Sequence, residues 1–294
     1  MLKIVFLDGG LANQAFQYIF YRYGMIECPK DDWYLDDSTF SIHNIHNGYE
    51  LADVFGVKPQ LLSSMFDKDV WEYMIEERKK RKCSIAQLFL DNDINIHGYF
   101  ESDLPAPYNS FTGQYFRFYD LPSKVVTVNE NAFYYGYYIC NDYLKAHADI
   151  IKAELQFPPL LDDKNINYQN DILNSESVSL HIRRGDYVEK GYASDNDIPI
   201  YKKMIENMHD QLSSMKLFVF SDDIEWCKDH AEELGINNVA HIFVEGNRKT
   251  NSYKDMQLMS MCKHMILCNS LFSYLAALLN NRLDKYIMPV DRKI

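Results

Sequence analysis

The sequence has no apolar run near the ~18 unbroken residues that a membrane-spanning helix needs. Its opening residues, MLKIVFLDGGLANQ, contain one lysine and a short apolar run that stops at Asp8. That pattern is typical of a first β-strand rather than of a secretory signal. We therefore expect a cytoplasmic protein without a transmembrane segment.

Positive charge is scarce, because 42 acidic residues outnumber 30 basic ones and the formal net charge is −12. A protein that binds nucleic acid over a wide surface shows the opposite balance, so nucleic acid is not expected as a partner. Any anion site must be local and concentrated. Hydrophobic residues make up 47% of the 294-residue chain, enough for two packed domains.

Cysteines are few and scattered, and no two of them form a CxxC pair, which argues against a disulfide framework and a zinc site. Buried or inert thiols in a reducing compartment are the simpler interpretation. GxGxxG and Walker loops are also missing, as are internal repeats and low-complexity tracts. The six cysteines are residues 28, 83, 140, 227, 262 and 268.

The C-terminal half alternates strand-like and helix-like segments, which predicts a parallel, doubly wound sheet. Between the first two strands, Tyr201, Met204, Ile205 and Met208 form one helical stripe. The strands are expected at 177–182, 216–223, 239–246, 265–270 and 285–290.

The N-terminal half opens in the same way, with a strand at 3–7, a glycine turn and a helix beginning near Leu11. Later helices are expected within 60–90 and 141–156, and a strand at 95–100. The charge run EERKKRK (76–82) is interpreted as an exposed helix face, with a patch for an acidic lipid or acceptor as the alternative.

Two α/β lobes are therefore predicted, an N-terminal lobe over 1–156 and a C-terminal lobe over 176–294. The stretch 157–175 contains two prolines and many Asn and Asp residues, and we interpret it as the linker. Because open parallel sheets bind ligands beyond the carboxyl ends of their strands, the segments there become candidates. They are DGGLANQ, HIRRGD, SDD, the turn before SYKD, and CNS.

Two adjacent arginines, Arg183 and Arg184, follow a predicted strand and are the main candidates for an anion site. Guanidinium groups match phosphate oxygens in bidentate fashion, so the pair suggests a pyrophosphate clamp, oriented by Asp186. The alternatives are a surface ion pair with Asp186 or Glu189, and an RGD adhesion tripeptide. His181 precedes them and is either a ligand contact or a core histidine.

The remaining candidates also lie at strand ends. Three of these segments have a structural alternative: a plain strand–helix connection at the first turn, and helix capping by Asp255 with Ser252 and by the CNS segment. The candidates are Gly10 and Asn13 in the first turn, Ser221 and Asp222 in SDD, Asp255, and Asn269, Ser270 and Ser273.

Paired carboxylates of the DxD type, which hold a divalent cation in metal-dependent sugar transferases, occur only in polar, loop-like stretches. They are Asp67 with Asp69, Asp91 with Asp93, and Asp195 with Asp197. The two arginines supply the positive charge that a metal would supply. We therefore expect a metal-free site and no cofactor.

Four segments in this order, GGLANQAFQY, HIRRGDYV, LFVFSDDIEW and YKDMQLMSMCKHMILCNSLFSYLAA, resemble glycosyltransferase family 11, the bacterial α-1,2-fucosyltransferases. The resemblance is strongest over 178–280. It implies a GT-B-like fold, with two Rossmann-like doubly wound lobes facing a cleft and GDP-β-L-fucose bound to the C-terminal one. The chain differs from the family pattern at Ala12, Leu271, Tyr274 and Leu275.

By the same resemblance, Arg183 holds the β-phosphate with support from Arg184, Asp186 and His181, and Asn13 reaches the donor from the N-terminal lobe. Asp255 contacts the guanosine part, and Ser270 and Ser273 the phosphates. The implied reaction is an inverting transfer of L-fucose to O2 of a terminal β-galactoside in a surface-glycan precursor.

A lipid-linked precursor would bring the protein to the membrane surface without crossing it. Asp186 and Glu189 are the candidate general bases. Another linkage, another nucleotide sugar, and a non-catalytic sugar- or nucleotide-binding protein are the alternative functions.

Overall fold

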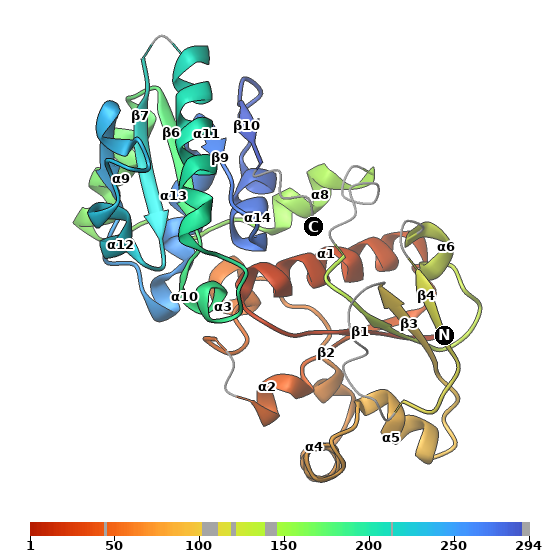
Figure 1. The fold of residues 1–294 in the computed structure, drawn as a ribbon. Helices are drawn as coiled ribbons and strands as arrows, with labels where there is room; N and C mark the ends of the chain where they lie inside the picture. Colours follow the sequence, from red (N-terminus) through yellow and green to blue (C-terminus); the bar gives the residue numbers. More distant parts are fainter. Residues whose placement is uncertain (44–45, 102–110, 119–121, 139–145, 213, 290–294) are drawn as a thin grey trace. The chain divides into compact units, whose positions relative to one another are not determined.

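The computed structural model describes residues 1–43, 46–101, 111–118, 122–138, 146–212 and 214–289 (Figure 1). Its chain divides into two compact units, Met1–Gln156 and Phe157–Ile294. None of the described helices combines the length and the apolar character needed to cross a bilayer.

The first unit is built on a sheet of five described strands in the order β2-β1-β5-β3-β4, all paired in parallel. Helix α1 packs on β1 and β2. The elements, in chain order, are β1 (Leu2–Phe6), α1 (Leu11–Glu27), β2 (Asp32–Asp36), α2 (Ser38–Ile42), α3 (Leu51–Phe55), η1 (Leu62–Met65), α4 (Lys68–Arg81), α5 (Ile85–Asp91), β3 (His97–Glu101), β4 (Tyr115–Phe118), α6 (Pro122–Val126), β5 (Ala132–Tyr135) and α8 (Ala148–Glu154).

The second unit has a parallel sheet in the order β10-β9-β6-β7-β8, which runs 5-4-1-2-3 when its own strands are numbered along the chain. That is the Rossmann order. The elements are α9 (Asp163–Leu173), β6 (Ser177–Ile182), α10 (Gly185–Glu189), η2 (Asp195–Asp197), α11 (Ile198–Gln211), β7 (Lys216–Ser221), α12 (Ile224–Asp229), η3 (Ile236–Asn238), β8 (Ala240–Phe243), η4 (Lys249–Asn251), α13 (Tyr253–Met261), β9 (His264–Ile266), α14 (Leu271–Leu279) and β10 (Ile287–Met288).

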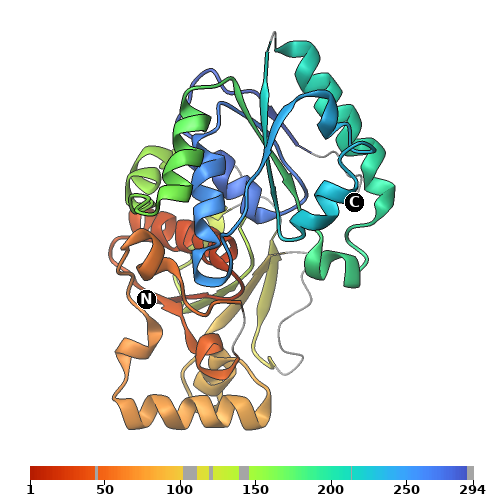
Figure 2. The ribbon, with the colours of Figure 1, turned by 90° about the vertical axis from the view of Figure 1, so that its left-hand side faces the viewer.

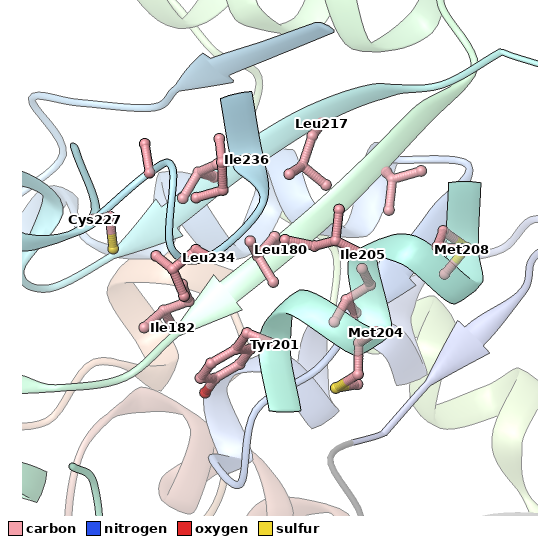
Figure 3. Packing of buried hydrophobic residues seen from close by; sticks show 14 of the residues in the cluster. Leu180, Ile182, Tyr201, Met204, Ile205, Met208, Leu217, Cys227, Leu234 and Ile236 are labelled. Carbon is pink, nitrogen blue, oxygen red and sulfur yellow. The ribbon is translucent and has the colours of Figure 1, made fainter. Parts of the chain in front are cut away.

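The core of the second unit explains why the predicted segments fold as they do. Every residue of β6 is buried, as expected for a parallel strand covered on both faces. The predicted stripe of α11, from Tyr201 to Met208, packs toward Leu180 and Ile182 on β6 (Figure 3). Pro199 lies at the start of α11, where a proline costs no intrahelical hydrogen bond.

The predicted linker differs from the structure, because residues 163–173 form helix α9 and belong to the second unit. Asp162 caps this helix by accepting a hydrogen bond from the Asn165 backbone amide at 3.0 Å. Helix α9 packs on α13, which gives its apolar residues a partner. The Asn and Asp residues that suggested an irregular segment instead serve as cap and polar face.

The charge run on α4 is exposed as predicted, except for Arg78, which is only 2% exposed. Figure 2 shows α4 along the outer edge of the first unit. Arg78 points inward, donates hydrogen bonds to Ser38 and Thr39, and lies over the Phe6 ring. Burial of this charge is tolerated because its N–H groups find acceptors.

The five described cysteines are free thiols, four of them buried, as the sequence predicted. Burial raises the pKa of all of them. The thiols are therefore protonated and inert at neutral pH. The sixth, Cys140, lies outside the described residues.

Candidate functional site

The predicted site segments HIRRGD and CNS follow two neighbouring strands, β6 and β9. Strand β6 is the point where the strand order of the second sheet reverses: β7 and β8 lie on one side of it, and β9 and β10 on the other. In open α/β sheets a ligand binds beyond the carboxyl ends of the strands at this switch point. The topology therefore brings both segments to the place where the fold binds ligands.

His181 connects these two strand ends. Its Nδ1 atom lies 3.0 Å from the Cys268 sulfur, and its ring packs against Phe272 at the start of α14. The side chain is buried, and burial, together with the nearby charge of Arg183, lowers the pKa of His181 to about 3. His181 is thus a neutral imidazole at working pH, and it positions the loop rather than acting as a cation.

The neutral state of His181 predicts a pH-dependent stability. Its pKa is about 3 in the folded protein and about 6.5 when unfolded, so the unfolded chain takes up the proton first as the pH falls. Stability is complete above pH ~6.5 and falls below it, by about 2 kcal/mol at pH 5. Urea denaturation at pH 7.5, 6 and 5 measures this slope. Near pH 5 this slope corresponds to uptake of about one proton on unfolding. A His181→Gln variant should lose that contribution, and an unchanged slope would contradict the assignment.

Arg183 is held by two carboxylates at the end of β6. Its Nη2 atom donates to Asp186 Oδ1 at 2.6 Å, and its Nη1 atom lies 3.0 Å from Asp222 Oδ2. The side chain is 29% exposed, so it retains N–H groups for an anion. The ion pair with Asp186, one of the alternatives to a phosphate clamp, is thus present. It orients the guanidinium and leaves other N–H groups available for an anion.

Asp186 is fully engaged, because it also accepts a hydrogen bond from Lys190 at 2.7 Å. Burial raises its pKa, but the hydrogen bond from Lys190 and the charge of Arg183 outweigh burial and hold the pKa below its usual range. A carboxylate with a lowered pKa is a weak proton acceptor. Asp186 fits an orienting role better than that of a general base.

Arg184 has different partners from Arg183. Its guanidinium carbon lies 3.6 Å from the centre of the Trp226 ring, and its Nη1 atom donates to Asp195 at 3.1 Å. Its Nε atom is 3.6 Å from Asp223, too far for a hydrogen bond. The side chain is 11% exposed. The two arginines therefore differ in their surroundings. Arg183 is the more accessible, whereas Arg184 packs mainly against Trp226.

The SDD segment at the end of β7 supports this turn. Asp222 accepts a hydrogen bond from the Arg184 backbone amide at 2.8 Å, while Ser221 accepts one from the Asp223 amide at 3.0 Å. Asp223 in turn caps α12. A Cβ atom at Gly185 would overlap Asp222, which explains the glycine. Ser221 and Asp222 thus bind protein groups here, and their contact with a donor stays a prediction.

The CNS segment lies at the start of α14. Ser270 caps the helix by accepting a hydrogen bond from Phe272, as one alternative expected, and Asn269 is exposed. Ser273 is completely buried and donates to the backbone carbonyls of Ser270 and Cys268. Among these three side chains, that of Asn269 is the exposed one, while Ser270 and Ser273 are buried. A phosphate contact at this helix N-terminus stays a prediction.

Of the two alternatives for Asp255, the capping box with Ser252 is wrong, because Ser252 makes no side-chain cap of α13. Asp255 instead accepts a hydrogen bond from Asn247 at 2.8 Å, and Asn247 exchanges two hydrogen bonds with Asn165 on α9. Burial raises the pKa of Asp255 to about 7. A ligand that donates N–H groups to this carboxylate would favour its ionised form.

Arg248 was not singled out from the sequence. It is exposed, and its guanidinium donates to the Asp222 backbone carbonyl at 3.1 Å, at the end of β7. The residue before it, Asn247, donates to Asp255. The turn before SYKD, at a strand end, was the only signal for it. It adds a third guanidinium to the carboxyl edge of the second sheet.

The GGLANQ turn of the first unit is held by its own residues. Gly9 has φ +79°, and a Cβ atom there would overlap the Asn13 amide. Gln14 donates to the carbonyls of Gly9 and Gly48. Asn13 is partly exposed, and its side chain has no hydrogen bond to another described residue. Gly10 begins α1 with an ordinary extended backbone, φ −81°.

Members of two of the three DxD-like pairs have structural partners. Asp91 pairs with Arg81, and Asp195 with Arg184. Asp197 forms a capping box with Ser194 at η2. Metal independence stays a prediction that these contacts do not test.

Solved structures share this fold. A fucosyltransferase NodZ from Bradyrhizobium aligns with a TM-score of 0.51 over 99% of this chain and 96% of that one, at 11% identity. FUT1 of Arabidopsis thaliana aligns with a TM-score of 0.51 over 99% of this chain and 71% of that one, at 10% identity. At such identities the likeness concerns the fold, and it confirms the predicted GT-B-like α/β class.

Two parallel α/β units, the second with an arginine-rich turn at its switch point, have the architecture of the GT-B-like class. Residues 74–292 match the model of Glycosyl transferase family 11, and the chain belongs to that family. It is similar to the O-antigen biosynthesis glycosyltransferase WbnK of Escherichia coli, 28% identical over 96% of this chain and 91% of the relative. An alpha-1,2-colitosyltransferase of Escherichia coli is 28% identical over 94% and 86%.

Proposed function

We propose that this protein transfers L-fucose from GDP-β-L-fucose, with inversion, to O2 of a terminal β-galactoside in a surface-glycan precursor. Membership of family 11 supports the class of reaction. The names of the relatives, one an O-antigen transferase and one an α-1,2-transferase, support the acceptor class and the linkage. We place the reaction in the cytoplasm, and at the membrane surface if the precursor is lipid-linked.

The single observation that carries the proposal is the accessible guanidinium of Arg183 at the β6/β9 switch point, held by Asp186 and Asp222. In the reaction, an acceptor oxygen forms a bond to C1 of fucose while the bond from C1 to the β-phosphate oxygen breaks. Negative charge develops on that phosphate. A guanidinium fixed beforehand stabilises this charge without reorganising, which makes it more effective than a mobile side chain.

A donor panel, run in parallel with and without EDTA, tests the proposal. GDP-fucose, GDP-mannose, UDP-galactose and GDP-colitose are each incubated with and without a β-galactoside, and release of the nucleoside diphosphate is measured. We expect acceptor-dependent turnover with GDP-fucose, and a product whose NMR spectrum shows an α-1,2 linkage.

Each other outcome identifies a different function. A preference for GDP-colitose, prompted by the name of one relative, would change the donor but keep the site. Binding of GDP without turnover would indicate a non-catalytic protein. Turnover that EDTA abolishes would contradict the metal-free site.

A further inference from the structure

A pair of buried side-chain amides lies within the second unit. Asn247 follows strand β8 and is 6% exposed, and Asn165 on α9 is 3% exposed. Asn247 Nδ2 donates to Asn165 Oδ1 at 2.8 Å, and Asn165 Nδ2 donates to Asn247 Oδ1 at 2.9 Å. Helix α9 also packs on α13, which carries Asp255 (Figure 1). The amide pair therefore connects α9 to the stretch between β8 and α13.

The orientation of the Asn247 side chain is fixed by its partners. Asn165 Nδ2 also donates to Asp162 Oδ1 at 2.8 Å, which determines where the nitrogen of the Asn165 amide lies. Asn247 must then present its oxygen to Asn165, and its second N–H group donates to Asp255 Oδ1 at 2.8 Å. Asp162 is itself paired with Lys254 at 2.9 Å. Each side-chain N–H group of the two asparagines has an acceptor, so the network has one hydrogen-bonding arrangement.

Asp255 has one oxygen held by this network and one available to a ligand. Its Oδ1 atom accepts the bond from Asn247, whereas its Oδ2 atom has no hydrogen bond from another described residue, and the side chain is partly exposed. A carboxylate only accepts hydrogen bonds, so its ligand must present N–H or O–H groups. Guanine presents two neighbouring donors on one edge, N1–H and the 2-amino group, whereas adenine, cytosine and uracil present one donor group each. A fixed carboxylate therefore suits guanine best among these bases.

The place of this network along the second sheet suits a nucleotide base. Strands β6, β7 and β8 are neighbours in that order, and Arg183 follows β6 while Asn247 follows β8. Two strand spacings amount to about 10 Å, a separation that a nucleoside diphosphate can span between its β-phosphate and its base. Arg248, next to Asn247 in the chain, donates to the Asp222 carbonyl at the end of β7, between the two. The arginine turn and the asparagine network thus belong to one edge of one sheet.

We propose that Asn247, held by Asn165, is a positioning residue that orients Asp255 so that the donor site selects guanine. The inference rests on the proposed use of GDP-fucose. Sequence reasoning singled out Asp255 but neither asparagine. With Asn247 in place, both guanine donors meet a carboxylate already turned toward them. Without it the carboxylate is free to rotate, and the second guanine donor loses its partner.

The charges around Asp255 add a second signature of this arrangement. Burial raises the pKa of Asp255 to about 7, while the hydrogen bond from Asn247 and the charges of Arg248 and Lys164 oppose the rise. Guanine N–H groups bind the ionised carboxylate, so the affinity for a guanine nucleotide should increase as the pH rises through this pKa. Removing Asn247 takes away a hydrogen bond to the ionised form and raises the pKa further. The rise in affinity should therefore move to higher pH in a variant without Asn247.

Calorimetric titration of the full chain with GDP and with IDP tests the inference, because the base of IDP keeps N1–H but lacks the 2-amino group. We expect the wild type at pH 8 to bind GDP about tenfold or more tightly than IDP, the usual effect of one hydrogen bond to a charged group. In Asn247→Ala this ratio should approach unity, mainly through weaker binding of GDP. Asn237→Ala, which alters an exposed asparagine on η3, is the control and should keep the wild-type ratio.

Two further measurements separate positioning from a damaged fold. If Asn247 acts through Asp255, the double variant Asn247→Ala/Asp255→Asn should show the same GDP-to-IDP ratio as Asp255→Asn alone. Titration with GDP-fucose between pH 6 and pH 9 should place the rise in affinity at higher pH in Asn247→Ala than in the wild type.

The outcomes for Asn247 and for the proposed function are distinct. Equal affinities of the wild type for GDP and IDP, or an Asn247→Ala variant that loses both nucleotides alike or keeps the wild-type ratio, would overturn the role of Asn247. A wild type that prefers GDP to IDP but transfers no fucose would refute the proposed function and leave the role of Asn247 intact.

Discussion

Arg183→Ala is expected to lower kcat for fucosyl transfer by about 10²–10³, the usual cost of losing a fixed donor aimed at a developing oxyanion. The guanidinium is oriented by protein groups, Asp186 and Asp222. It therefore acts on the charge that forms on the departing phosphate, and kcat should fall more than the Kd for GDP-fucose rises. Steady-state kinetics with GDP-fucose, together with titration calorimetry, measure the two effects separately.

Two further variants make this result specific. Arg183→Lys keeps the positive charge but loses the two-pronged donor, so it should fall between wild type and Arg183→Ala. Arg81→Ala removes an arginine on α4 whose partner is Asp91, and it should leave kcat unchanged. Turnover of Arg183→Ala within threefold of wild type would refute the assignment of this residue.

Asp222→Ala is expected to lower kcat/KM by about 10- to 100-fold, because small misplacements of catalytic groups carry costs of this size. This carboxylate holds the Arg184 backbone amide at 2.8 Å and approaches Arg183 Nη1 at 3.0 Å. Removing it leaves a partly buried amide without a partner and frees the more accessible guanidinium. The loss should appear in kcat/KM, measured by the rate of GDP release.

Asp195→Ala is the matched control, since Asp195 also pairs with one of the two arginines. Its side chain is 68% exposed and makes one contact with Arg184 at 3.1 Å. Exposed ion pairs contribute about 0–1 kcal/mol, so this variant should stay within a few-fold of wild type. Equal losses in the two variants would show that the orienting role of Asp222 is wrong.

The second unit could be predicted largely from sequence because its signals are local. The stripe on α11 and the strand SVSLHI each sit within one element, and packing of α11 on β6 follows from their apolar faces. Strand ends gave the site segments, because the carboxyl ends of parallel strands share one edge. The linker prediction was wrong because this stretch contains a short, polar helix, α9, which depends on packing against α13.

The contacts within the site could not be predicted, because they join residues far apart in the chain. His181 meets Cys268, Arg184 meets Asp222, and Asp255 meets Asn247 and, through it, Asn165. The charge run on α4 gave no sign that Arg78 is buried. Helical periodicity predicts which residues share a face, but it does not tell which charged side chain has hydrogen-bond acceptors in the interior.

A crystal structure of the protein soaked with GDP and magnesium chloride tests the role of Arg183 most directly. We expect the β-phosphate to bind the guanidinium of Arg183 at the ends of β6 and β9, with no metal ion between phosphate and protein. A diphosphate bound away from Arg183, or joined to carboxylates through a magnesium ion, would contradict it.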